Sequence, residues 1–254
     1  MRVAVVGGTG LVGRHVVDAF VTTDVDVVVV SRERGVDLTT GAGLDRALAG
    51  VQRIIDVSNV RTTDEAKATA FFTAAGAQLQ AAAARVDADR IVLLSIVGID
   101  RVPSGYYAAK LAHEETTKAG EVPTVVLRST QFHEFAGQVL TWDRDGAVSR
   151  VPEMLVQPVA AESIAAELVE LALAESPSAT ADVGGPLVEQ LVDLATRVAA
   201  RRGEPERVEG HRDDTERAEL LAGGALLPAP DARLIGPTFA EWLDAGERSP
   251  HLPW

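Results

Sequence analysis

The glycine-rich segment that follows the first apolar run constrains the fold more than any other feature of the chain. Residues 2–6 read RVAVV, and GGTGLVG then covers residues 7–13 before a helix-like stretch begins. Gly8, Gly10 and Gly13 satisfy the G-x-G-x-x-G spacing that joins a strand to a helix at a dinucleotide site. There the first two glycines form a tight turn beside a pyrophosphate, the third packs the helix on the sheet, and the helix N-terminus attracts the phosphates. The segment predicts a βαβ unit that binds a dinucleotide.

The rest of the first 130 residues continues this alternation of strands and helices. Its apolar runs are β-branched and nearly continuous, as in parallel strands that are buried on both faces. With right-handed crossovers, the pattern predicts an α/β protein of the Rossmann type, with a doubly wound parallel sheet. The expected strands are residues 2–6, 26–30, 53–57, 90–95 and 123–128, and the expected helices are residues 11–21, 43–49, 64–86 and 105–119.

The pattern changes after Arg128. Residues 131–142, 161–174 and 187–202 are expected to be helical, residues 155–159 to form a strand that extends the sheet, and residues 223–237 to form loops. Late segments of this kind cover the carboxyl ends of the strands, where ligands bind. We therefore expect a nucleotide-binding core over residues 1–160 and a small, mostly helical region over residues 161–254 that covers the substrate pocket, both within one structural domain.

Composition and charge narrow the possible partners. The 254 residues carry a formal net charge of −13 without an offsetting basic stripe, which argues against binding to nucleic acid. The chain has no cysteine, its histidines lack metal-ligand spacing, and its longest aliphatic run is VVVV at residues 27–30. The N-terminus does not resemble a signal peptide. These features predict a cytoplasmic protein that binds a small molecule, without a metal or a membrane span; they leave open whether it is a monomer or a homodimer.

The end of the second expected strand bears on the choice of dinucleotide. An NAD site has an acidic residue at this place, which bonds the ribose 2′-hydroxyl. Here Ser31 and Arg32 follow the strand, and Asp26 stands at its beginning. Arg32 and Arg14 could bind a 2′-phosphate through charge-assisted hydrogen bonds. The sequence therefore favours NADP(H) over NAD(H), although both arginines could also be solvated surface charges.

Six motifs follow one another along the first part of the chain: GGTGLVG at 7–13, VDL at 36–38, DVSNV at 56–60, LLSIVG at 93–98, YYAAK at 106–110 and LRSTQFHEF at 127–135. This ordered set resembles the atypical short-chain dehydrogenase/reductase family, in its NmrA-like, NAD(P)H-binding branch. The resemblance extends from residue 1 to about residue 175. It implies a Rossmann fold, an NAD(P) cofactor and the reduction of a carbonyl, enone, quinone or similar acceptor.

The resemblance also assigns residues to the cofactor and the substrate. Asp37 and Leu38 would lie against the adenine, and residues 56–59 would run beneath the adenosine ribose and the nicotinamide half. Ser163 departs from the aspartate that many relatives have at its position. Together with the glycine loop, the expected cofactor contacts are Gly7, Gly8, Thr9, Gly10, Leu11, Val12, Gly13, Arg14, Ser31, Arg32, Asp37, Leu38, Val57, Ser58, Asn59 and Lys110, and the expected substrate contacts are Gln131, Phe132 and His133.

Two adjacent tyrosines precede Lys110, and helical phase distinguishes them. Tyr106 lies on the same side as Lys110, opposite an apolar stripe, and Tyr107 lies at the border of that stripe. The apolar stripe comprises Ala108, Leu111, Ala112 and Ala119, and the polar side comprises Tyr106, Lys110, His113, Glu114 and Thr117. The Y-x-x-x-K pair could also be an accident on a solvated helix face.

The chemistry of a reductase suits Tyr106, Lys110 and Ser95. The phenol would donate a proton, the ammonium would lower the pKa of that phenol and hold the nicotinamide ribose, and Ser95 would polarise the substrate oxygen. We therefore expect an NADPH-dependent oxidoreductase. A non-catalytic NAD(P) redox sensor is the alternative, and isomerisation or epimerisation with a bound nicotinamide is a third possibility.

Overall fold

The computed structural model describes residues 1–246. Its contacts group the chain into two compact units, of which the first comprises Met1–Arg128 with Ile164–Ala181. The second comprises Ser129–Ser163 and the chain from Asp182 onward. The predicted division into residues 1–160 and 161–254 stays a prediction, and its last residues, 247–254, lie outside the described part.

A seven-stranded sheet confirms the predicted α/β, Rossmann-type fold. The strand order is β12-β9-β5-β4-β3-β1-β2. All five expected strands are present, with ends that shift by about one residue. The sequence pattern did not indicate β9 or β12. The strands are β1 (Arg2–Val6), β2 (Asp26–Val30), β3 (Arg53–Asp56), β4 (Arg90–Ile96), β5 (Thr124–Ser129), β9 (Thr180–Gly184) and β12 (Arg233–Leu234).

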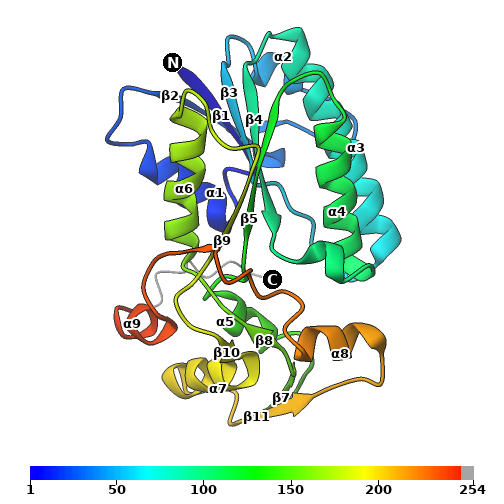
Figure 1. Ribbon diagram of the computed structural model, residues 1–254, viewed down its shortest axis with the longest axis vertical. Coiled ribbons are helices and arrows are strands. Elements are labelled where there is room, and N and C mark those ends of the chain that lie inside the picture. Colours follow the sequence, from blue (N-terminus) through cyan, green and yellow to red (C-terminus); the bar gives the residue numbers. More distant parts are fainter. Residues whose placement is uncertain (247–254) are drawn as a thin grey trace. The chain divides into compact units, whose positions relative to one another are not determined.

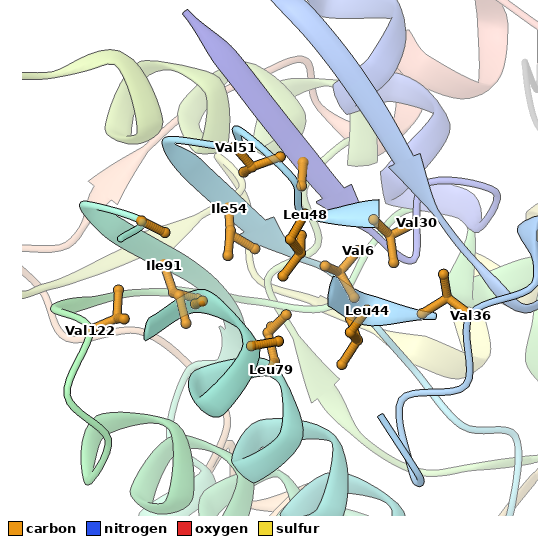
Figure 2. Packing of buried hydrophobic residues seen from close by; sticks show 14 residues of the cluster. Val6, Val30, Val36, Leu44, Leu48, Val51, Ile54, Leu79, Ile91 and Val122 are labelled. Carbon is orange, nitrogen blue, oxygen red and sulfur yellow. The ribbon is translucent and has the colours of Figure 1, made fainter. Parts of the chain in front are cut away.

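Helices cover both faces of the sheet. In Figure 1, α3 (Glu65–Arg85) and α4 (Gly105–Lys118) lie on one face, and α1 (Leu11–Ala19) and α6 (Ala161–Leu173) lie on the other. The short α2 (Leu44–Ala47) adds leucines to the core on the side of α3. Figure 2 shows this core, where valines and isoleucines of the strands meet leucines of α2 and α3. No helix among residues 1–246 is both long enough and apolar enough to cross a membrane.

A buried glutamine joins α3 to the segment between α4 and β5. The two N–H groups of the Gln80 amide donate to the carbonyl oxygens of Thr117 and Val122, at 2.6 and 3.0 Å, and the amide nitrogen lies 3.0 Å from the Thr124 hydroxyl oxygen. The Thr124 hydroxyl contacts the same two carbonyls, at 3.2 and 3.3 Å. The Gln80 amide oxygen accepts from the Val122 N–H at 3.0 Å, so this side chain satisfies a buried N–H and shares two buried carbonyls with Thr124.

The second unit contains short strands as well as helices. β7 (Val148–Pro152) pairs in parallel with β11 (Arg207–His211) and antiparallel with β6 (Arg144–Asp145). The predicted strand at 155–159 is reduced to β8 (Leu155–Val156), which pairs with β10 (Glu189–Gln190) and does not extend the large sheet. The helices here are α5 (Phe135–Val139), α7 (Leu191–Arg202), α8 (Glu216–Ala222) and α9 (Phe239–Asp244).

The bounds of α5 and α7 correct two predictions. Of the predicted helix at 131–142, only the residues of α5 are α-helical, and residues 131 and 132 are extended, where Phe132 forms a β-bridge with Val159. Of the predicted helix at 187–202, the first residues form β10. Both corrections concern short elements, in which pairing with distant segments outweighs local preference.

Replacement of Gln80 tests its structural role. Gln80→Leu keeps most of the volume but leaves the Val122 N–H buried without its acceptor and removes the donor to two carbonyls, so the free energy of unfolding should fall by about 1–3 kcal/mol. Urea denaturation measures this change. Gln78→Leu, on the same helix, is the control and should change stability by less than about 0.5 kcal/mol. Equal effects of both substitutions would contradict the assigned role.

Candidate active site

The carboxyl ends of three strands bring the predicted cofactor residues together. Val6 of β1 is in register with Val30 of β2 and with Asp56 of β3. Gly7, Ser31 and Val57 therefore leave the sheet side by side. The strand order reverses between β1 and β3, and such a switch point is where open α/β sheets bind ligands.

Gly7 carries the positive φ of the tight turn after β1. Its φ is +81°, and a Cβ there would lie 2.8 Å from the Val57 carbonyl oxygen. The turn closes with a hydrogen bond from the Gly10 N–H to the Gly7 oxygen at 2.9 Å, so Gly8 and Gly10 both belong to it, as predicted, although the sequence motif did not identify Gly7. Gly13 permits the close approach of α1, because a Cβ there would collide with the Gly7 oxygen.

Gly10 leaves the loop surface open. It is exposed, has an ordinary φ of −77°, and a Cβ there would contact only the Gly7 oxygen, at 3.2 Å. It begins α1, whose first turn has neither a side-chain cap nor an acidic residue. The positive end of the helix is therefore free to attract an anion. Arg14 holds the loop through its Nε, which donates to the Thr9 oxygen at 2.9 Å, while Leu11 is half-buried and Val12 is buried.

The end of β2 carries no acidic partner for a ribose. Asp26, at the other end of the strand, forms an ion pair with Arg2 at 3.1 Å. The Ser31 hydroxyl is buried without a hydrogen-bond partner among residues 1–246. Arg32 is exposed at the start of a 3₁₀ turn over Arg32–Arg34, and its guanidinium has no partner in the described part of the chain.

Asp37 and Leu38 have local structural roles in the loop that follows. Asp37 Oδ1 accepts hydrogen bonds from the Thr39 N–H at 2.8 Å and the Thr39 hydroxyl at 2.7 Å. These bonds lower the pKa of the exposed Asp37 carboxyl. Leu38 packs partly buried against the core cluster. Their proposed contact with adenine stays a prediction.

The loop after β3 connects the glycine loop to α4. Asp56 is buried, and its Oδ1 accepts from the Ser58 N–H at 2.8 Å. The Ser58 hydroxyl is buried without a partner among the described residues. Asn59 Oδ1 accepts from the Val60 N–H and from the Tyr106 hydroxyl, each at 2.7 Å. Tyr106 is therefore the tyrosine that reaches this edge of the sheet.

Helix α4 turns its polar side inward, which is the opposite of what the apolar stripe suggests. Lys110, His113 and Glu114 are buried, whereas Leu111 is half-buried. Ala108 and Ala112 are also half-buried, and Ala119 is exposed. The periodicity grouped the residues correctly but did not identify the covered side. The alternative of a solvated helix face is wrong for these residues.

Lys110 is held by three groups beneath the site. Its Nζ donates to the Leu94 oxygen at 2.9 Å, lies 3.3 Å from His113 Nδ1 and sits 4.8 Å from the centre of the Phe72 ring. Burial lowers the pKa of Lys110 to about 8, against the attraction of Asp56 and Glu114. An ammonium has three N–H donors. Leu94 and His113 take two of them within residues 1–246.

The expected effect of Lys110 on Tyr106 is wrong. Burial, and after it the neighbouring Tyr107, raises the pKa of the Tyr106 phenol above its ordinary value. The ammonium is directed to Leu94 and His113, while the phenol bonds Asn59. The Tyr106 ring packs edge-on against Phe72, with the ring centres 5.7 Å apart. The phenol is therefore fully protonated near neutral pH.

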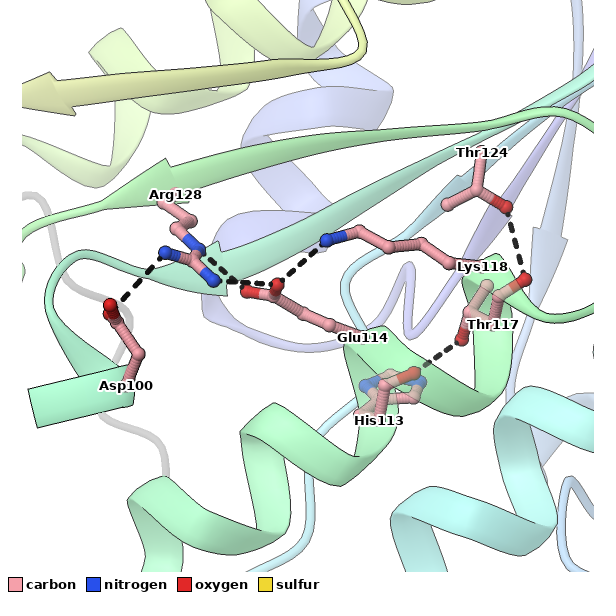
Figure 3. Close-up of polar contacts among 7 residues, drawn as sticks. All are labelled: Asp100, His113, Glu114, Thr117, Lys118, Thr124 and Arg128. Atoms are coloured by element: carbon pink, nitrogen blue, oxygen red, sulfur yellow. Dashed lines mark hydrogen bonds and ion pairs between the residues drawn. The ribbon is translucent and has the colours of Figure 1, made fainter. Parts of the chain in front are cut away.

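Ser95 lies within β4, next to a buried ion pair that the sequence did not reveal. Arg128 binds both carboxylate oxygens of Glu114 at 2.9 Å, and Lys118 adds a contact at 3.1 Å (Figure 3). Burial alone would raise the pKa of Glu114, but Arg128 outweighs it, so the pKa is lowered. The buried Ser95 hydroxyl contributes to this lowering, although it forms no well-aligned hydrogen bond.

The predicted substrate residues belong to the second unit. His133 is fully buried between Phe239 and Trp242, and its Nε2 lies 3.1 Å from the Pro237 oxygen. Burial lowers the pKa of His133 to about 4, so the ring is neutral. Phe132 is half-buried, and Gln131 has a buried side-chain amide without a partner among residues 1–246. Packing against Phe239 and Trp242 accounts for the burial of His133. The role of Gln131, Phe132 and His133 in binding a substrate stays a prediction.

Comparison with known proteins agrees on the fold. No protein-family model matches the sequence, and no curated protein matches it. The NADPH-dependent quinone oxidoreductase QOR2 of Escherichia coli, solved with NADPH, is similar in structure, with a TM-score of 0.69 and 16% identity over 96% of this chain and 99% of that one. A dTDP-4-dehydrorhamnose reductase of Clostridium acetobutylicum reaches a TM-score of 0.71 at 15% identity over the same shares. The protein thus shares the Rossmann-type fold of these structures.

The lowered pKa of Lys110 predicts how stability depends on pH. The pKa is about 8 in the folded protein and 10.5 ordinarily. Below about pH 8 the lysine is charged in both states, but between about pH 8 and pH 10 the unfolded chain binds more protons. The free energy of unfolding should therefore rise with pH, by up to ~1.4 kcal/mol per unit. Urea denaturation at several pH values measures the slope, and Lys110→Met should remove this contribution; identical slopes would refute the shift.

Proposed function

We propose that the protein is an NADPH-dependent oxidoreductase of the short-chain dehydrogenase/reductase type, in the NmrA-like branch, that reduces a small carbonyl, enone, quinone or similar acceptor. The observation that carries the proposal is the junction of the glycine loop with the loop after β3. A Cβ on Gly7 would lie 2.8 Å from the Val57 oxygen, and two residues later Asn59 binds the Tyr106 hydroxyl. The glycine turn, which we propose binds phosphate, and the helix that carries Tyr106 and Lys110 thus adjoin one loop.

The residues at this edge fit a dinucleotide. The exposed Gly10 and the uncapped start of α1 suit a pyrophosphate, because the backbone can approach it without a side chain between. Similar structures hold such ligands: QOR2 is complexed with NADPH, and MoeE5, at a TM-score of 0.65 and 14% identity, is complexed with UDP-glucose and NAD. In our proposal Val57, Ser58 and Asn59 line the way from the pyrophosphate to the nicotinamide.

Arg32 and Ser31 favour the phosphorylated cofactor. A guanidinium without a protein partner can form paired charge-assisted bonds with a 2′-phosphate, and the buried Ser31 hydroxyl can donate one more. Asp26, which could have bonded a ribose hydroxyl, lies at the opposite end of β2 and binds Arg2. Arg14 is committed to Thr9 and contributes by fixing the loop.

The protein's own groups would orient the reactants and supply a proton. The bound nicotinamide would provide the hydride. Lys110 would donate its third N–H to a ribose hydroxyl and so fix the ring. Tyr106 would transfer its proton to the substrate oxygen after leaving Asn59, and the protonated phenol is ready for this role. The role of Ser95 in polarising the substrate oxygen stays a prediction, because its hydroxyl is buried and has no hydrogen-bond partner among residues 1–246.

One observation favours the second candidate, a non-catalytic NAD(P) sensor. The Tyr106 phenol is committed to Asn59 with a raised pKa, and the Ser95 hydroxyl is buried beside Glu114. Proton transfer from Tyr106 would therefore require the phenol to leave Asn59 first, and the Ser95 hydroxyl would have to become accessible to the substrate. In a sensor both would serve to shape the cofactor site only. Turnover with any acceptor separates the two candidates.

Arg32→Ala tests the choice of cofactor. The loss of a charge-assisted hydrogen bond should weaken NADPH binding by roughly 1.5–3 kcal/mol, or about tenfold or more, while NADH binding should barely change. Calorimetry with both cofactors measures this difference. Gly10→Val is the companion variant and should abolish binding of both, because its side chain occupies the place of the pyrophosphate. Equal weakening of both cofactors by Arg32→Ala would mean that Arg32 is structural.

Tyr106→Phe tests catalysis. A screen of NADPH oxidation over aldehydes, ketones, quinones, enones and imines first identifies a substrate. The variant keeps the ring packed on Phe72 but lacks the proton donor, so turnover at saturating NADPH should fall by ~10²–10⁴. Tyr107→Phe is the control and should stay within a few-fold. If the screen finds no substrate although NADPH binds, or if Tyr106→Phe retains turnover, the sensor becomes the better proposal.

A further inference from the structure

His113 lies fully buried between two charged groups. Its Nδ1 is 3.3 Å from Lys110 Nζ, and its Nε2 is 3.3 Å from Asp56 Oδ2, close enough for electrostatic attraction although the two atoms are not aligned for a hydrogen bond. The Phe72 ring stacks on the imidazole, with centres 4.9 Å apart and planes inclined by 29°. Lys110, Asp56 and Phe72 thus surround the imidazole. Its Nδ1 faces the Lys110 ammonium, and its Nε2 faces the Asp56 carboxylate.

The chemistry of the two neighbours fixes the position of the imidazole hydrogen. A lysine ammonium can only donate hydrogen bonds, so Nδ1 must carry a lone pair. An ionised carboxylate can only accept, so Nε2 must carry the hydrogen. Asp56 is itself held in place by the Ser58 N–H at its other oxygen. From β3 to α4, the groups therefore follow one another in this order: the Asp56 carboxylate, the Nε2–H of His113, the Nδ1 of His113 and the Lys110 ammonium.

Burial and the Lys110 ammonium favour the neutral form of the imidazole. Burial, and after it the Lys110 ammonium, lowers the pKa of His113, while Asp56 and Glu114 oppose this effect. These charges come from β3 and α4. From α3, Phe72 covers the ring, and Gly76 leaves room for it, because a Cβ there would lie 3.3 Å from His113 Cδ2. A neutral His113 ring can interact favourably with both the Asp56 carboxylate and the Lys110 ammonium, and it adds no positive charge of its own between them.

We propose that Asp56 and His113 are positioning residues for Lys110. Through the tautomer that Asp56 imposes, His113 accepts one N–H of the ammonium, the Leu94 carbonyl accepts the second, and the third N–H points to the cofactor. The pair also keeps Lys110 charged in a buried place. The role toward the cofactor rests on the function proposed above, whereas the tautomer and the charge of Lys110 can be measured on the protein alone.

Nitrogen NMR of the protein without cofactor tests the tautomer directly. The ¹⁵N shifts of the His113 ring should show a hydrogen on Nε2 and none on Nδ1 at neutral pH, and His113→Asn assigns the signal by its disappearance. In Asp56→Asn, the new side-chain oxygen can still accept from Ser58, and its NH₂ then faces Nε2. Both ring nitrogens then face hydrogen-bond donors, so the ring should no longer be held in the single Nε2–H form and its ¹⁵N shifts should change. An imidazolium or an Nδ1–H ring in the unaltered protein would overturn the proposal.

Calorimetry of NADPH binding against pH tests the consequence for Lys110. In the unaltered protein the affinity should fall as pH rises through about 8, where Lys110 loses its charge. His113→Phe keeps the stacking on Phe72 but removes the acceptor, so this fall should move to lower pH, with roughly tenfold weaker binding near neutrality. His113→Asn, whose amide oxygen can take the place of Nδ1, should restore the original profile.

A matched control is available in the second unit. His211 is exposed, and its Nε2 lies 2.7 Å from Asp213 Oδ1, so His211→Phe also removes a histidine–carboxylate pair. It should leave the binding profile unchanged. The proposal would be overturned if His113→Phe had the same dependence of NADPH affinity on pH as the unaltered protein. It would also be overturned if His113→Phe and His113→Asn had the same dependence as each other. If the unaltered protein shows the expected tautomer but does not bind NADPH, the proposed function fails while the placement of Lys110 stands.

Discussion

The buried ion pair between Glu114 and Arg128 decides which side of α4 faces the sheet. Arg128 reaches both oxygens of a carboxylate that is 1% exposed, which ties the middle of α4 to β5. A buried charge that loses its partner costs about 3–5 kcal/mol, so the helix cannot rotate without a large penalty. Tyr106 and Lys110 lie on the same side of the helix and are therefore turned toward the strand ends. The orientation of Tyr106 and Lys110 therefore depends on the Glu114–Arg128 ion pair, which no substrate would contact.

Much of the fold and of the site's location could be predicted from the sequence, because these depend on short-range patterns. Continuous β-branched runs indicated the five strands that begin the sheet, and the glycine loop indicated where β1 gives way to α1. The choice of Tyr106 over Tyr107 also followed from helical spacing. The positive φ of Gly7 could not be predicted, because the spacing of the motif does not reveal which glycine has a left-handed conformation.

Other features depend on partners that are distant in the sequence. Periodicity showed which residues share a side of α4, but Arg128 and Asp56, which make the polar side the buried one, come from β5 and β3. Two-residue strands such as β8 and β10 carry no recognisable pattern, since each is defined by its pairing with the other. The raised pKa of Tyr106 likewise depends on its surroundings, because burial raises it while Lys110, four residues away, is directed to Leu94 and His113.

The strand β9 makes the folding of the first part of the chain depend on the later part. Its residues fall in both compact units, and the chain passes between those units at three places: after Arg128, after Ser163 and after Ala181. A fragment that ended near residue 160 would lack β9, the neighbour of β5 in the sheet. The unpaired N–H and C=O groups of β5 would then be available to other chains, which makes such a fragment prone to aggregate. Limited proteolysis in the segment between β5 and α6 would therefore nick the protein without releasing an independently folded half.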